Sequence, residues 1–116
     1  MVTEFRQIVF SSRDLSEAIS HFYRQKRPDL GGASIRNIRI ARETPSPITV
    51  SMDIESDGRT ESVTLESAFL AAAMLRHCFK LGIPISRHSR KNIELVGDNL
   101  ALKLFINADR TAGEAQ

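Results

Sequence analysis

The chain has few of the residues that mark particular classes of protein. Its 116 residues include one cysteine, one tyrosine and no tryptophan. The single cysteine, Cys78, excludes an internal disulfide framework and fits a reducing compartment, so we expect a cytoplasmic protein. The scarcity of aromatic side chains leaves little of the base-stacking surface that RNA-recognition domains use.

Several sequence patterns that define membrane, phosphate-binding and catalytic segments are also missing. No stretch approaches the about 20 apolar residues of a membrane span, and the N-terminus has no basic region followed by an apolar core. Neither a phosphate-binding glycine loop nor a serine nucleophile elbow is present. Three histidines and one cysteine provide no zinc-binding spacing. We therefore expect no metal, cofactor, membrane partner or catalytic residues, and hence a protein that is not an enzyme.

The composition that remains is ordinary for a globular domain. Hydrophobic residues make up 41% of the chain and charged residues 26%. The net charge is +2, from 16 basic and 14 acidic residues, which is a weaker excess than a dedicated nucleic-acid binder carries. We expect one domain over residues 1–107 and a flexible C-terminal tail over residues 108–116.

The two halves of the chain resemble each other. When residues 8–40 are shifted forward by 55, six of the 33 positions are identical. The identical pairs are Ser12/Ser67, Leu15/Leu70, Ala18/Ala73, Ser34/Ser89, Asn37/Asn92 and Ile38/Ile93. Such self-similarity is typical of one supersecondary unit used twice. It predicts two repeats, over about residues 4–55 and 60–106.

Hydrophobic periodicity predicts the elements of the first repeat. Residues 4–10 read as a strand, and a helix follows with Asp14 as N-cap and Glu17 completing a capping box. Residues 34–41 and 48–56 alternate as two further strands, and the loop RETPSP between them should be irregular. Asp57-Gly58 is a hairpin turn signal that leads into the second repeat.

The second repeat follows the same order. A strand near residues 59–67 precedes a helix from about residue 67 to residue 81, and two strands surround Gly97-Asp98-Asn99. The prediction is an α+β fold in which two β-α-β-β repeats form one mainly antiparallel sheet with two helices packed on one face. Each repeat is too small to bury its apolar face alone, so the halves should complete each other around a pseudo-twofold axis.

The segment RDLSEAISHFY, residues 13–23, resembles the first helix of the vicinal-oxygen-chelate (glyoxalase-like) family. That resemblance implies duplicated β-α-β-β-β modules with His and Glu metal ligands on strands. This chain departs from the pattern, because each repeat has one strand fewer and no matching ligands stand at the strand starts. No site residue is therefore taken from the resemblance.

The second helix carries apolar residues on every side, which is typical of a helix that is covered all round. A sheet in the same chain can cover only one side, so we expect a homodimer with Phe69, Ala72 and Phe79 near the contact. The leading functional hypothesis is a small interaction or regulatory protein that acts through protein–protein contacts.

A basic loop supplies the alternative hypothesis. Arg87, His88, Arg90 and Lys91 form the densest cationic cluster in the sequence. Such a cluster can bind an anion or a nucleic acid, with affinity that falls as salt rises. The competing interpretation is a solvated loop without a ligand.

Four further residues have both structural and functional interpretations. His77 occupies the stripe position that Phe22 holds in the first repeat, which suits a core histidine or an interface residue rather than a ligand. Cys78 is expected to be a buried structural thiol. Asp53 and Glu55 share one strand face and are expected to point to solvent, where they make the surface more polar rather than catalyse.

Overall fold

The computed structural model describes residues 3–41 and 47–107. Its elements, in chain order, are β1 (Thr3–Phe10), α1 (Ser12–Lys26), the short 3₁₀ helix η1 (Pro28–Leu30), β2 (Ser34–Ile40), β3 (Val50–Ser56), β4 (Arg59–Leu65), α2 (Ser67–Lys80), β5 (Arg90–Val96) and β6 (Asn99–Asn107). The predicted α+β class with antiparallel strands is confirmed. The RETPSP loop lies mostly outside the described residues, and the predicted C-terminal tail lies wholly outside them.

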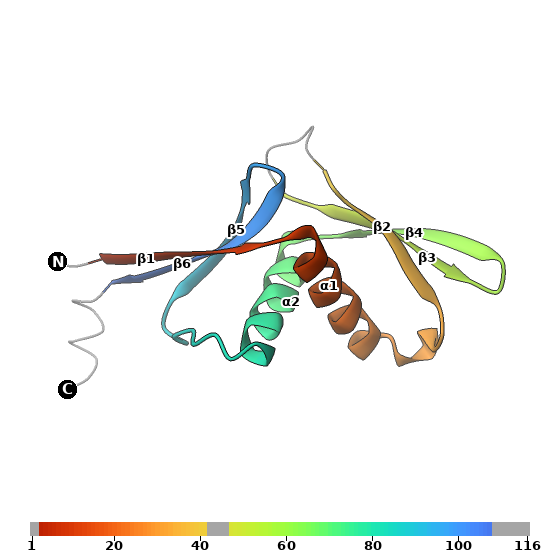
Figure 1. Cartoon of the computed structure of the whole chain (residues 1–116), viewed down its shortest axis with the longest axis horizontal. Helices are drawn as coiled ribbons and strands as arrows, with labels where there is room; N and C mark the ends of the chain where they lie inside the picture. Colours follow the sequence, from red (N-terminus) through yellow and green to blue (C-terminus); the bar gives the residue numbers. More distant parts are fainter. Residues whose placement is uncertain (1–2, 42–46, 108–116) are drawn as a thin grey trace.

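The six strands form two three-stranded sheets, where the sequence predicted one. Their orders are β1-β6-β5 and β2-β3-β4, and every ladder is antiparallel. In Figure 1 the two helices lie in the centre, with one sheet on each side of them. Alternation along a strand shows which side chains are buried but does not show which strands pair, so only the structure gives this grouping of the strands.

Each sheet takes one strand from the other half of the chain. The hairpin β5–β6 is completed by β1, which pairs with β6 from Thr3↔Asn107 to Phe10↔Leu100. The hairpin β2–β3 is completed by β4, which pairs with β3 from Val50↔Leu65 to Ser56↔Arg59. Neither half therefore contains all the strands of a sheet.

Helix α1 begins three residues earlier than the sequence predicted, at Ser12. Ser11 is the N-cap, and its Oγ accepts a hydrogen bond from the backbone N–H of Asp14 at 3.1 Å. The assignment of Asp14 as N-cap was wrong, because the Ser11 hydroxyl already occupies that role one turn earlier. The carboxylate of Asp14 is thereby left to face the other helix.

The core lies where the two helices pack against the sheets. The largest fully buried side chains come from both helices and from the central strands β3 and β6: Ile19, Val50, Met52, Leu70, Met74, Cys78, Leu100, Leu102 and Leu104. The two helices contact each other, and Ala18 and Ala73 are both buried along that contact. In the described part of the chain, neither helix has the length and hydrophobicity needed to cross a membrane.

The predicted turn at Asp57-Gly58 is confirmed. Both residues have positive φ, 52° and 76°, as a two-residue type I′ hairpin requires. Asn37 is also a non-glycine residue with positive φ, at 55°, and it lies where the β2–β3 register shifts between Arg36 and Arg39. An irregularity in the ladder thus turns the Asn37 side chain toward the neighbouring strand.

Asp53 collects three polar partners on the solvent side of β3. Its carboxylate accepts hydrogen bonds from Asn37 Nδ2 at 2.9 Å, Ser62 Oγ at 2.9 Å and the guanidinium of Arg39 at 3.3 Å. These bonds lower the pKa of Asp53 from 3.8 to about 2. The prediction that Asp53 faces away from the core is therefore correct, and its role is to tie β2, β3 and β4 together.

This network predicts a pH effect on stability. The folded state holds Asp53 ionised, so its contribution is present above the unfolded pKa and disappears as the pH falls through about 2. We expect Asp53→Asn to be less stable than the natural protein at pH 5 to 7, and the difference to shrink toward pH 2. Urea unfolding of both proteins between pH 2 and pH 7 measures this difference in the free energy of unfolding. A difference in stability that stays constant down to pH 2 would show that ionised Asp53 does not stabilise the fold.

Candidate functional site on the outer face of helix α2

The outer face of α2 is not covered within the described chain. Ala72 and Phe79 are exposed, and 56% of the Phe79 surface faces solvent. Phe69, the third predicted interface residue, packs edge-to-face against Phe22 with ring centroids 5.1 Å apart. Phe69 therefore belongs to the α1–α2 contact, whereas Ala72 and Phe79 stay accessible to a partner.

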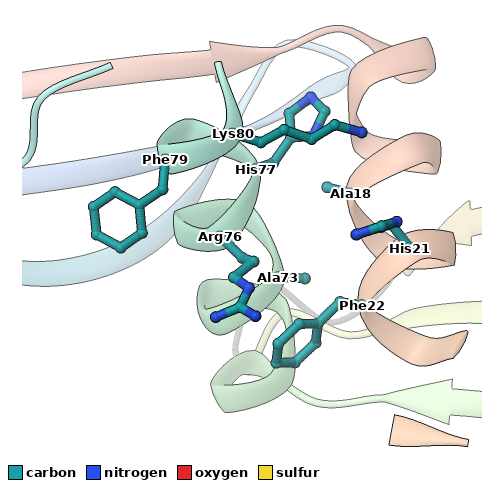
Figure 2. A pocket seen from close by; sticks show the side chains of 8 residues that line it. All are labelled: Ala18, His21, Phe22, Ala73, Arg76, His77, Phe79 and Lys80. Atoms are coloured by element: carbon teal, nitrogen blue, oxygen red, sulfur yellow. The ribbon is translucent and has the colours of Figure 1, made fainter. Parts of the chain in front are cut away.

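A hollow of about 320 Å³ lies between α1 and α2, and we call it the helix-pair hollow. It is lined by Ala18, His21, Phe22, Ala73, Arg76, His77, Phe79 and Lys80. Figure 2 shows the two alanines between the helices, where their small side chains leave room. Phe79 projects from α2 on the side away from α1.

A second hollow, of about 470 Å³, lies on the other side of Phe79, and we call it the loop hollow. Its lining is Leu75, Phe79, Ile85, Ser86, Arg87 and Lys91. Phe79 lines both hollows and so forms the ridge between them. The structure thus places a predicted interface residue beside two residues of the basic loop.

The charged side chains that line the two hollows are basic, and among the described residues no carboxylate lines either of them. The carboxylates of Asp14 and Glu17 lie close to His77, which lines the helix-pair hollow. Arg76, Lys80 and Arg87 make no hydrogen bond or ion pair within residues 3–41 and 47–107. A larger hollow of about 640 Å³ beside β5 differs, because its lining includes both Glu94 and Lys103, whose charged groups lie 3.9 Å apart.

The four residues of the predicted basic cluster have different surroundings: two contact other parts of the chain and two are exposed. Lys91 donates hydrogen bonds to the backbone oxygens of Ser89 at 2.9 Å and Ser86 at 3.5 Å, so it holds the loop's own turn. The guanidinium of Arg90 lies 5.5 Å from the centroid of the Phe105 ring, in a cation–π contact. Arg87 and His88 remain exposed.

Sequence reasoning missed two cations of this surface. Arg76 lies three residues before Phe79 and four before Lys80, so helical spacing places Arg76 next to each of them on α2. That spacing was the available signal. The many apolar residues of α2 mask this spacing in the sequence.

His77 lies beneath this surface and is 4% exposed. Its Nε2 is 3.4 Å from Oδ1 of Asp14, and its ring centroid is 5.7 Å from that of Phe10. The interpretation as a core histidine fits this burial. A ligand atom of His77, one of Asp14 and one of Glu17 all lie within 4.8 Å of one another, a grouping that sequence reasoning did not find.

Cys78 is fully buried, as the sequence predicted. Burial raises the pKa of the Cys78 thiol, so the thiol stays protonated at neutral pH and is a poor nucleophile. The residue packs in the core and takes no part in the surface around Phe79.

The geometry defines a two-sheet α+β domain with a cationic surface that centres on one exposed aromatic residue. Comparisons with protein-family models, curated proteins and solved structures found no match to this chain. The function proposed below therefore rests on the contacts and charges of the chain itself.

Proposed function

We propose that this protein is a non-enzymatic interaction module that binds an acidic, partly apolar segment of another protein. The binding surface, called the Phe79 surface below, comprises Phe79, Arg76, Lys80 and Arg87 with the two adjoining hollows. One observation carries the proposal: an exposed aromatic ridge stands among three cations without partners in the described chain, and no carboxylate lines the hollows.

The side-chain chemistry of the Phe79 surface suits a protein partner. Aromatic and arginine side chains dominate the binding energy of protein interfaces, and the hollows beside Phe79 leave space for apolar side chains of a partner. The cations favour a partner with carboxylates and raise the rate of encounter with it. Lysine and arginine without local partners do not have to break existing ion pairs when the partner binds.

The same charges argue against a second copy of the chain as the occupant. A twofold dimer presents one patch to itself, so Arg76 and Lys80 would face their own copies or lie close to them. Like charges brought together at an interface are unfavourable. The homodimer that the sequence suggested is therefore an outcome to be tested, and an acidic partner is the proposal.

The test uses a fluorescent peptide of about 15 residues that interleaves glutamate with leucine and phenylalanine. We expect binding, measured by anisotropy, to weaken as salt rises because the charges are screened. Phe79→Ala should weaken it by about tenfold or more, since an aromatic anchor contributes at least about 1.4 kcal/mol. Phe5→Ala is the matched control, because Phe5 is 63% exposed but lines a different hollow.

Three results would overturn the proposal. The first is equal peptide affinity for the natural protein and Phe79→Ala. The second is tighter binding of a DNA duplex with no response to Phe79→Ala, which would favour the basic loop as a nucleic-acid site. The third is a salt-resistant dimer, measured by light scattering, that Phe79→Ala dissociates, because the second copy would then occupy the surface.

A further inference from the structure

Three side chains capable of binding a metal meet where the N-terminal half of α1 faces α2. Asp14 and Glu17 are three residues apart on α1 and therefore share one side of that helix. His77 comes from α2, 63 residues from Asp14 in sequence. The ligand atoms of all three lie within 4.8 Å of one another.

The distance between His77 Nε2 and Asp14 Oδ1 is one that two ligands of the same ion can have. Their Nε2 and Oδ1 atoms are 3.4 Å apart. A charge-assisted hydrogen bond between such groups is shorter, about 2.7–2.9 Å. A tetrahedral ion with bonds of about 2.0–2.1 Å holds neighbouring ligand atoms about 3.4 Å apart.

His77 is a polar ring placed among buried groups. It is 4% exposed, and within the described chain its Nε2 has no polar partner outside the Asp14–Glu17 pair. The only polar partner of this nitrogen among the described residues is Asp14 Oδ1, and the aligned position in the first half of the chain holds the apolar Phe22. A metal ion would bind the imidazole nitrogen and both carboxylates together, in place of the ion pair that Glu17 makes with Arg13 at 3.5 Å.

Neighbouring groups orient Asp14 and leave space beside His77, as a metal site requires. Oδ2 of Asp14 accepts a hydrogen bond from Ser11 Oγ at 3.0 Å, which leaves Oδ1 turned toward His77. Supporting bonds of this kind orient metal-ligating carboxylates. His77 also lines the helix-pair hollow, so water has room to complete the coordination.

We propose that Asp14, Glu17 and His77 bind one divalent transition-metal ion that joins α1 to α2. Imidazole with two carboxylates suits Zn²⁺ and its first-row neighbours, whereas Ca²⁺ and Mg²⁺ prefer sites made entirely of oxygen ligands. The site goes beyond the interaction function: His77 lines one of the hollows beside Phe79, but neither Phe79 nor the cations of its surface supplies a ligand. It replaces the expectation, drawn from sequence, that no metal is bound.

The test adds Zn²⁺ and, separately, Co²⁺ to the full chain after treatment with chelator. We expect one ion per chain by calorimetry, a higher Tm with Zn²⁺, and the visible absorption of Co²⁺ bound by nitrogen and oxygen. Glu17→Gln should weaken Zn²⁺ binding by at least tenfold. The Glu17 side chain is 52% exposed, so this variant should still fold. Glu66→Gln is the control, because Glu66 is exposed and its side chain makes no capping bond.

The proposal fails if neither ion binds, or if Glu17→Gln and Asp14→Asn both bind Zn²⁺ as tightly as the natural protein. A Co²⁺ spectrum with sulfur charge-transfer bands would also overturn it, because the ion would then be bound to Cys78. Phe79→Ala should leave the metal affinity unchanged, so failure of the metal site and failure of the interaction surface can be told apart.

Discussion

Leu102→Ala is expected to lower the free energy of unfolding by about 2–5 kcal/mol. Leu102 is fully buried, and it lies on β6, the central strand of its sheet. On that strand it pairs with Ile8 of β1 and Ile93 of β5. Removal of its branched side chain leaves a cavity at the point where three strands meet the core, and close-packed neighbours relax only partly to fill it.

Denaturant unfolding of the purified variant measures this loss. Leu81→Ala is the matched control: the chemical change is the same, but Leu81 is 57% exposed at the C-cap of α2. A change within about 0.5 kcal/mol is expected for that control. Comparable losses in both variants would mean that β6 does not lie in the core as described.

Cleavage of the chain between Asp57 and Gly58 is expected to give two fragments that do not fold separately but do fold together. The cut falls in an exposed hairpin turn, so it removes no core contact. It does separate β3 from β4 and β1 from β6, which pair across the two halves. Each fragment keeps a single two-stranded hairpin, which is marginal in water without a third strand or helix packing.

Circular dichroism and amide NMR dispersion of residues 1–57, residues 58–116 and their equimolar mixture test this prediction. The mixture should regain the spectrum of the intact chain and elute as one species. A fragment that alone shows cooperative unfolding would contradict the exchanged pairing. The intact chain with Gly58→Ala, which strains the positive φ without cutting the backbone, is the control and should remain folded.

The two proposed sites share α2 but depend on different residues. Phe79, Arg76 and Lys80 point outward from the helix, whereas His77 is buried beneath them and faces Asp14 on α1. A metal ion between the helices would fix the position of α2 against α1. It would therefore hold the Phe79 surface in one arrangement before a partner binds, and preorganisation of this kind increases affinity.

The sequence by itself determined the local structure. Alternation of Val50, Met52 and Ile54 set the buried face of β3, and all three residues have at most 5% exposure. The Asp57-Gly58 pair set the hairpin turn, and the apolar stripe of α1 set the side that packs inward. These features depend on neighbours within a few residues, where backbone sterics and periodicity act directly.

Only the tertiary structure decided which segments meet. It divided the strands between two sheets, brought Phe79 beside Arg87, and set Asp14 against His77. Periodicity identifies a buried face but carries no information about the distant segment that covers it, because many pairings bury the same apolar area. In the structure β1 pairs with β6, and α1 packs against α2. Both proposed sites depend on this arrangement of distant segments.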